Sequence, residues 1–199
     1  MFTGIIEAVG TVTSVSPLGR TAAVRIESAG LDLSDVSIGD SIAVSGVCLT
    51  VKSLGAQSID FDVSAETLDV TIGFHEADRV NLEKSLRLDT RIGGHLVSGH
   101  VDAVGEVDEV TETDGNRVMR LRFPEALARF FARKGSVTVN GVSLTVNSVD
   151  SGVFSVNLIP HTLAVTNLGD LRKGSRVNLE IDLVARYVER MLGDTGAGT

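Results

Sequence analysis

The sequence predicts a mostly β protein made of two homologous small closed barrels, one after the other. Of its 199 residues, 28 are Val and 21 are Gly but only 3 are Pro, a composition typical of strands joined by tight turns. Apolar residues recur with a period of two in short runs that Gly, Asn, Asp and Ser interrupt. Many short strands favour a closed barrel, because closure removes the exposed edges of a sheet.

The prediction of two barrels comes from a repeat at an offset of 95 residues. The segment SIAVSGVCLTV at 41–51 aligns with SVTVNGVSLTV at 136–146, and 7 of the 11 positions are identical. The same offset relates 4–10 to 99–105 and 61–68 to 156–163. After two extra residues in the second copy, VNLE at 80–83 matches VNLE at 177–180. We therefore predict two domains, 1–95 and 96–182, with Gly93 and Gly94 as a short hinge.

Two segments have helical patterns. Residues 124–134 begin with Pro124, which suits the first turn of a helix, and are followed by Gly135, which suits its end. Residues 183–192 form the second helix, and the first copy of the repeat has no counterpart to it. This helix either mediates oligomerisation or packs against its own barrel, and residues 193–199 are predicted to be a disordered tail. Its apolar stripe comprises Leu183, Val184, Tyr187, Val188, Met191 and Leu192.

Charge and composition exclude several classes of function. The formal net charge is −8 and no cluster of Lys and Arg is present, which argues against nucleic acid as the main partner. No apolar run approaches the roughly 20 residues that span a bilayer, and the first residues lack the basic region of a secretory signal. The single cysteine, Cys48, excludes an internal disulfide framework. We expect a soluble cytoplasmic protein without membrane contact.

The repeated strand indicates a binding surface outside each barrel. In residues 46–51, the apolar side chains of the strand share the face that fills the barrel, and Cys48 and Thr50 share the other face. Ser143 and Thr145 occupy this outer face in the second copy. Such small polar groups suit a flat polar heterocycle, although an ordinary solvated strand face has the same pattern. Because cysteine is seldom left on an open surface, a ligand or a neighbour is expected to cover Cys48.

The histidines favour acid–base chemistry over a metal site. His95 and His100 are five residues apart, a spacing that sends them to opposite faces of a strand, and no second cysteine is available, so we predict no metal site. His100 is either a proton-transfer group or a hydrogen-bonded structural histidine. His100 replaces Ile5 of the first copy, and Ser143 replaces Cys48 in the second. Two copies that differ at reactive positions are typical of a two-fold site that handles two similar ligands in different roles.

Four segments carry a resemblance to a known family: MFTGIIE at 1–7, GVCLTV at 46–51, IGGHLVSGHV at 92–101 and GVSLTV at 141–146. Together they resemble the riboflavin synthase α-chain over residues 1–190. The resemblance implies an all-β fold of two homologous six-stranded antiparallel Greek-key-type β-barrels (an internal duplication) plus a C-terminal α-helix. Each barrel would bind one 6,7-dimethyl-8-ribityllumazine.

The resemblance also implies an activity and an assembly. In the implied reaction, one lumazine donates a four-carbon unit to another and gives riboflavin and 5-amino-6-ribitylaminouracil, with no cofactor and no metal. It implies a homotrimer joined by the C-terminal helices, with each lumazine pair held between the N-terminal barrel of one subunit and the C-terminal barrel of another. Lumazine synthase is a candidate partner. A non-catalytic lumazine- or flavin-binding protein is the alternative, and retention of the reactive residues favours the enzyme.

The family's functional positions carry over residue by residue. The resemblance assigns one lumazine to the N-terminal barrel, through Gly4, Ile5, Ile6, Cys48, Leu49, Thr50, Asp62, Val63, Ser64, Ala65, Glu66 and Thr67. It assigns the other to the C-terminal barrel, through Gly99, His100, Val101, Lys134, Ser143, Leu144, Thr145, Ile159, Pro160, His161, Thr162, Leu163 and Ala164. The residues that it implicates in catalysis are Ser41, Cys48, His100, Thr145 and Asp182.

The implied roles follow from the chemistry of these side chains. His100 with Thr145 would transfer protons, Cys48 with Ser41 would activate C7 of the partner lumazine, and Asp182 would orient a neighbouring polar group. Phe2 would cover the ring. Two positions depart from the family's pattern: His161 stands where an acidic residue is common and is expected to alter ribityl contacts, and Asn140 stands where Asp is common and is expected to affect only a turn.

Overall fold

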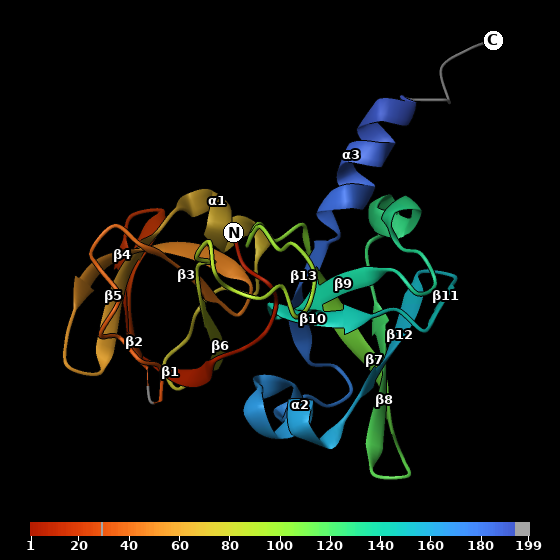
Figure 1. The fold of residues 1–199 in the computed structure, drawn as a ribbon, viewed down its shortest axis with the longest axis horizontal. Helices are drawn as coiled ribbons and strands as arrows, with labels where there is room; N and C mark the ends of the chain where they lie inside the picture. The colour runs from red at the N-terminus through yellow and green to blue at the C-terminus, as the bar shows by residue number, and fades with distance from the viewer. Residues whose placement is uncertain (29, 194–199) are drawn as a thin grey trace.

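The first six strands form a closed antiparallel barrel (Figure 1). A computed structural model describes residues 1–28 and 30–193. The strand order is β1-β2-β5-β4-β3-β6, and β6 pairs back with β1, so this barrel has no open edge. A short helix, α1, joins β5 to β6. The elements are β1 (Ala8–Leu18), β2 (Thr21–Glu27), β3 (Ser41–Val44), β4 (Val47–Leu54), β5 (Ser58–Val63), α1 (Ala65–Val70) and β6 (Arg79–Lys84).

The second half of the chain forms a seven-stranded sheet with the order β10-β9-β13-β7-β8-β12-β11. This order is that of the first barrel, except that the counterpart of β4 is split into the two edge strands β10 and β11. Val146 and Asn147 separate these strands: the buried Val146 donates its amide to the Gly135 carbonyl, and the Asn147 amide donates to the Ser155 carbonyl of β12 at 2.8 Å. The elements are β7 (Ala103–Thr113), β8 (Asn116–Arg122), η1 (Glu125–Phe130), β9 (Ser136–Val139), β10 (Val142–Thr145), β11 (Ser148–Asp150), β12 (Val153–Leu158), α2 (Pro160–Val165), η2 (Asn167–Asp170), β13 (Arg176–Ile181) and α3 (Leu183–Leu192).

The predicted all-β class and duplication are confirmed. Strands β1, β2, β3 and β5 and helix α1 each recur 95 residues later, and β6 recurs 97 residues later as β13. Each half has its own core of apolar side chains, filled by the inward face of the strands. In β4, for example, Val47, Leu49 and Val51 are buried while Thr50 is exposed, as the alternation predicts. The second copy is a seven-stranded sheet with the strand order of the first barrel and one strand interrupted, so the expected second closed barrel is only partly formed.

The helical predictions are partly wrong. The segment 124–134 contains only a 3₁₀ helix over Glu125–Phe130, because Phe131 turns inward and stacks between Phe123 and Phe154, at ring separations of 4.3 and 4.8 Å. Helices α1 and α2 were not predicted, since six residues are too few to show a helical period. Their place directly after β5 and β12 matters for the site described below.

Helix α3 projects away from both barrels (Figure 1). Its polar side is tied to the second barrel by the ion pairs of Arg186 with Asp102 and of Glu189 with Arg129, at 2.6 and 2.8 Å. The apolar stripe is open: Val184, Tyr187, Val188, Met191 and Leu192 are exposed. The interpretation in which this stripe packs on its own barrel is therefore wrong. Within residues 1–28 and 30–193, no helix has the length and apolarity to cross a membrane. Of the predicted disordered tail, residues 194–199 lie outside the described residues.

The two barrels meet at the tips of two equivalent hairpins. The turn at Ser45 and Gly46 joins β3 to β4, the turn at Asn140 and Gly141 joins β9 to β10, and all four residues have positive φ. A Cβ on Gly141 would lie 2.7 Å from the Gly46 nitrogen. Glycine is needed at both positions, because the two backbones approach too closely for any side chain.

Buried amide side chains join the barrels around these turns. Asn81 donates to the Asn140 carbonyl and to Asn167 Oδ1, both at 2.9 Å, and at the equivalent place Asn178 donates to the Ser45 carbonyl, also at 2.9 Å. The Asn140 side chain accepts from the Asn178 amide and donates to Asn167. The expectation that position 140 affects only a turn is therefore wrong. An Asp at that position would lack the Nδ2 group that donates to Asn167.

Replacing Gly141 with Ala should destabilise the protein more than the same change at Gly152. Both glycines have φ +79, but a Cβ on Gly152 has no neighbour closer than 4.0 Å. We expect Gly152→Ala to cost about 1 kcal/mol through backbone strain, and Gly141→Ala to cost about 3 kcal/mol because the clash with Gly46 is added. Urea unfolding of both variants measures the difference. Equal losses would show that the barrels separate at the turns without cost.

Candidate active site

Two equivalent segments cross each other between the barrels. The first arm (residues 2–6) precedes β1, and the second arm (residues 97–101), at an offset of 95, precedes β7. Phe2 and Val97 form an antiparallel bridge with N–O distances of 2.8 and 3.0 Å. Near this crossing, a Cβ on Gly94 would lie 2.2 Å from the Thr3 carbonyl oxygen and 2.6 Å from Ser143 Cβ. The glycine that was expected to act as a hinge is therefore required for close packing.

A buried glutamate holds each arm. Glu83 in β6 accepts hydrogen bonds from the Thr3 amide and hydroxyl, at 2.6 and 2.7 Å, and from the Gly4 amide at 3.0 Å. Glu180 in β13 holds Ser98 and Gly99 with the same three bonds, at 2.7, 2.6 and 2.9 Å. Burial raises the pKa of both Glu83 and Glu180 and outweighs these hydrogen bonds, which act in the opposite direction. Each arm is thus fixed by bidentate contacts to one carboxylate.

Beyond the glutamates, each arm continues onto the other barrel. The Cys48 amide of β4 donates to the Gly99 carbonyl, and the Ser143 amide of β10 donates to the Gly4 carbonyl, both at 2.8 Å. Val101 packs on the first core and Ile6 on the second. The family resemblance assigns residues 4–6 to the ligand surface of the N-terminal barrel and residues 99–101 to that of the C-terminal barrel. In the structure each of these segments instead lies against the outer face of the opposite barrel.

The exchanged second arm completes a pocket of about 450 Å³ on the first barrel. Its strand wall comes from β4 at Cys48, its helix wall from α1 at Glu66 and Thr67, and its third wall from the arm at His100. The pocket therefore joins a thiol, a carboxylate, a hydroxyl and an imidazole above an apolar floor, a set able to bind a polar ring and move protons. The lining residues are Val47, Cys48, Glu66, Thr67, Val70, Thr71, Gly99, His100 and Val101.

Six of the nine residues that line this pocket could be predicted from the sequence. Cys48, Glu66, Thr67, Gly99, His100 and Val101 were predicted, whereas Val47, Val70 and Thr71 were missed. Val70 and Thr71 end helix α1, which the sequence did not reveal.

A matching surface on the second barrel has a different chemistry. The positions at the repeat offset are Val142, Ser143, His161, Thr162, Val165 and Thr166, with Gly4, Ile5 and Ile6 of the first arm. Here Ile5 stands in place of His100 and is 49% exposed.

His95, which the sequence reasoning considered only as a metal ligand, forms a 2.8 Å hydrogen bond with the Ser143 hydroxyl. Burial lowers the pKa of His95, and the negative charge of Asp182 partly opposes this shift. Burial therefore favours the neutral form of the His95 imidazole. No repeat partner exists for this residue, so the alignment of the two copies gave no signal for it.

The other predicted residues lie at several distances from the pocket. Phe2 is fully buried beside Cys48 and Gly99, so it supports the pocket from below and offers no surface to cover a ring. Ser41 lines a separate cavity of about 60 Å³ with Lys84 and Arg87. His100 lines the pocket at Cys48, whereas Thr145 lies exposed on β10 of the second sheet and does not line that pocket.

Several of the predicted site residues have a structural role or face away from the binding surface. Asp182 caps α3 by accepting from the Val184 amide at 2.9 Å. Leu49 and Val63 face the first core and can offer only their backbone to a ligand. Ser64 caps α1, whereas Ile159 precedes α2 without a side-chain cap. The remaining predicted residues lie on β4 and β5 (Thr50, Asp62), in α1 (Ala65), beside the second core (Leu144, Leu163) and at the start or within α2 (Pro160, His161, Thr162, Ala164).

Lys134 has an unusual backbone conformation. It has φ +69, at the position where the first copy has Gly39 with φ +96. A residue with a side chain in this conformation costs about 1 kcal/mol or more. Its amide donates to the Val146 carbonyl at 2.7 Å, at the interruption between β10 and β11, and its side chain is exposed. The strain places a lysine where the repeat would otherwise have glycine, and such strain is common at functional sites.

Comparison with known proteins agrees with this geometry. The lumazine binding domain family matches residues 3–85 and again residues 98–182. The riboflavin synthase of Photobacterium phosphoreum is 48% identical over 96% of this chain and 89% of its own length. Those of Brucella abortus and Mycobacterium tuberculosis are 46% and 44% identical, over 96% and 98% of this chain and 98% and 100% of their own.

Solved structures agree in fold. LumP complexed with riboflavin superposes with a TM-score of 0.83 at 26% identity, covering 91% of this chain and 99% of LumP. LumP complexed with 6,7-dimethyl-8-(1'-D-ribityl) lumazine superposes with a TM-score of 0.81 at the same identity. With the domain present twice and near full-length relatives at 44–48% identity, the chain belongs to the riboflavin synthase family.

Proposed function

We propose that this protein is the enzyme riboflavin synthase, a transferase that converts two molecules of 6,7-dimethyl-8-ribityllumazine into riboflavin and 5-amino-6-ribitylaminouracil. The observation that carries the proposal is the pocket at Cys48, where an exchanged arm brings His100 to the outer face of a lumazine-binding barrel. The related riboflavin synthases support the same reaction. One lumazine donates a four-carbon unit, and the other accepts it.

The reaction needs positioning and proton transfer. The C7 methyl group of the lumazine is acidic, because its carbanion is delocalised into the pteridine, so a protein base can create a carbon nucleophile. Holding two identical rings face to face supplies much of the acceleration through proximity and orientation. Two barrels related by an internal duplication suit the binding of two such rings in an antiparallel arrangement.

We assign the two binding surfaces to different roles. In the pocket of the first barrel, His100 exchanges the proton and Cys48 activates C7, while Glu66 and Thr67 at the start of α1 hold the ribityl chain. On the second barrel, Ser143 and Thr145, with Lys134 beside the strand interruption, hold the other lumazine. His161 alters the ribityl contacts there, because it replaces the carboxylate of Glu66 with an imidazole. Ser41 and Asp182 act indirectly, through β3 and through His95.

We further propose a homotrimer in the cytoplasm, joined by the apolar stripe of α3. The exposed stripe supports this assembly, because it leaves five apolar side chains without a covering partner among the described residues. Within each chain the units are the lumazine-binding domains 1–95 and 96–182, the oligomerisation helix 183–192 and the tail 193–199. Lumazine synthase, the enzyme that makes the substrate, is a partner that this assembly could bind.

The alternative is a non-catalytic protein that only binds the lumazine. The structural similarity to LumP, which was solved with riboflavin and with the lumazine bound, is the observation that favours this alternative. Cys48 and His100 in one pocket favour the enzyme, because a carrier needs neither a thiol nor a proton-transfer group at the ring.

Incubating the purified protein with the lumazine should produce riboflavin without added metal or nucleotide. The absorbance of riboflavin follows the reaction, and EDTA should leave the rate unchanged, because the proposed chemistry uses only side chains. Binding of the lumazine without turnover would identify a carrier, and loss of activity with EDTA would contradict the proposed mechanism.

Cys48→Ala should lower kcat by at least tenfold while lumazine binding stays within about twofold. The thiol is half-buried and the Cys48 amide, which holds the second arm, is kept in the variant, so the pocket should retain its shape. Steady-state kinetics and a fluorescence titration separate the two effects. An equal loss of binding and turnover would assign Cys48 to binding alone.

Introducing a charge into the α3 stripe should dissociate the trimer and reduce activity. Val188→Asp places a carboxylate among exposed apolar side chains without disturbing either core, and Arg190→Ala, on the polar side, is the matched control. Light scattering should give a monomer for the first variant and a trimer for the second. A fully active monomer would contradict a site shared between subunits.

A further inference from the structure

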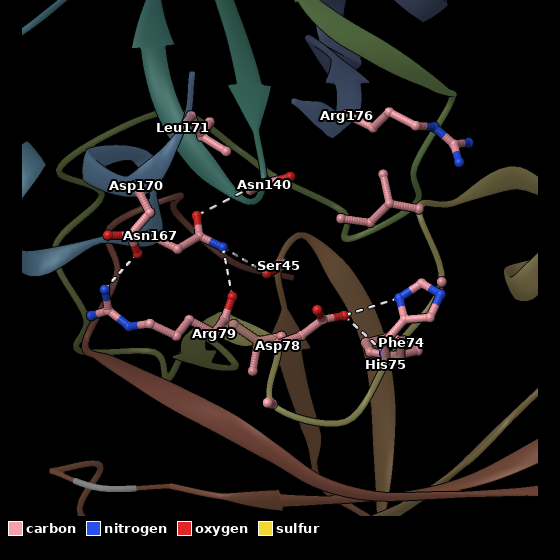
Figure 2. Close-up of a pocket in the computed structure, with 14 residues that line it drawn as sticks. Ser45, Phe74, His75, Asp78, Arg79, Asn140, Asn167, Asp170, Leu171 and Arg176 are labelled. Carbon is pink, nitrogen blue, oxygen red and sulfur yellow. Dashed lines mark hydrogen bonds and ion pairs between the residues drawn. The ribbon is translucent and has the colours of Figure 1, made fainter. Parts of the chain in front are cut away.

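A second cavity, of about 590 Å³, lies between the two barrels and is larger than the pocket at Cys48. It is formed by the loop that follows α1, by the loop that follows α2 and by the hairpin turns at Ser45 and Asn140 (Figure 2). Neither arm and none of the site residues predicted from the sequence line it. A cavity of this size accommodates a small organic molecule.

Most residues that line this interbarrel cavity have an equivalent in the other copy of the repeat, and the equivalence fails at one place. Arg79 and Arg176 begin the equivalent strands β6 and β13. The loops before these strands start with the same hydrogen bond. The Gly73 amide donates to the Thr71 hydroxyl at 3.1 Å, and the Leu168 amide donates to the Thr166 hydroxyl at 3.2 Å. These pairs are 95 residues apart.

The same loops also end alike. The His75 amide donates to the Asp78 carboxylate at 2.8 Å, and the Arg172 amide donates to the Ser175 hydroxyl at 3.0 Å. These two pairs are 97 residues apart. The two extra residues of the second copy therefore lie between Leu168 and Arg172. Leu171 lines the cavity as Phe74 does, so the extra pair is Gly169 and Asp170.

This insertion makes the charges of the cavity unequal. Asp170 reaches across to the first barrel and forms an ion pair with Arg79. The first copy lacks the insertion, so no equivalent carboxylate reaches Arg176, which forms no ion pair within residues 1–28 and 30–193. Glu106, its neighbour on β7, pairs instead with Arg122 at 3.6 Å.

Asp78, the remaining carboxylate of the cavity, is engaged by the backbone and ring of His75 at 2.8 and 3.2 Å. Figure 2 shows the Arg79–Asp170 pair on one side of the cavity and Arg176 on the other, on the same side as His75. The formal charges of Arg79, Arg176, Asp78 and Asp170 balance across the lining, and Arg176 is the guanidinium that has no carboxylate partner among the described residues.

The rest of the lining determines what else a ligand must carry. Four of the lining residues are apolar: Ile72, Phe74, Val80 and Leu171. The side-chain amides of the lining are already paired, as in the 2.9 Å hydrogen bond from Asn167 to the Arg79 carbonyl, and offer little to a polar ligand.

We propose that the interbarrel cavity binds a small molecule with an apolar ring and a phosphate or carboxylate group. The anionic group of this ligand would pair with Arg176, as the carboxylate of Asp170 pairs with Arg79. A guanidinium binds either anion through two parallel hydrogen bonds.

Titration calorimetry of the full-length protein with 1-naphthyl phosphate tests this site. We expect one molecule bound per chain. Arg176→Ala should weaken binding at least tenfold, because it removes the free guanidinium. Asp170→Asn should strengthen binding several-fold, because it frees Arg79 as a second cation. Arg172→Ala removes an exposed arginine of the same loop that does not line the cavity, and binding should be unchanged.

Two comparisons identify the ligand class. Inorganic phosphate should bind more weakly than the naphthyl ester, and 1-naphthol should not bind, while 1-naphthoate distinguishes a carboxylate from a phosphate preference. All three variants should keep their melting temperature within a few degrees and form riboflavin at the normal rate, because none touches the lumazine pockets. The proposal is overturned if the unmodified protein does not bind 1-naphthyl phosphate at millimolar concentration, or if Arg176→Ala binds it as well as Arg172→Ala does.

Discussion

The exchange of the two arms is the constraint on which the candidate site depends. Each arm is fixed by a buried glutamate of one barrel and then bonds, through the carbonyl of Gly4 or Gly99, to a strand of the other. The lumazine-type pocket at Cys48 is therefore completed by a residue from the other copy of the repeat. Because the two carboxylates are buried and accept three hydrogen bonds each, the arms cannot move without leaving buried acceptors unpaired. The pocket is in this sense preorganised.

The proposed treatment of two like ligands in different roles rests on the duplication. The same scaffold places a strand, a helix start and an arm at each of the two surfaces, and the copies differ in the side chains that they present there. Cys48 and His100 supply a thiol and an imidazole on one side, where Ser143 and Ile5 stand on the other. The second side has His95, whose pKa burial lowers, and Lys134, whose backbone has a strained positive φ. A donor and an acceptor of the same molecule require an asymmetry of this kind.

Much of this could be predicted from the sequence, because duplication leaves a direct signal. The repeat offset predicted the strands, and the alternation in residues 46–51 predicted which side chains of β4 face outward. The exchange of the arms could not be predicted, since it depends on backbone hydrogen bonds between the two copies, such as that from the Cys48 amide to the Gly99 carbonyl. Helices α1 and α2 were too short to show a period. The two extra residues were visible in the alignment, but only the structure shows that one of them neutralises Arg79.

The central claim is that each chain presents two separate binding surfaces for the same pteridine, each completed by the arm of the other repeat. The most direct measurement is the binding stoichiometry of 6,7-dimethyl-8-ribityllumazine in the Cys48→Ala variant, in which turnover is slow enough for equilibrium titration. The account predicts two molecules bound per chain. A single molecule per chain, with the second barrel unoccupied at saturation, would contradict it.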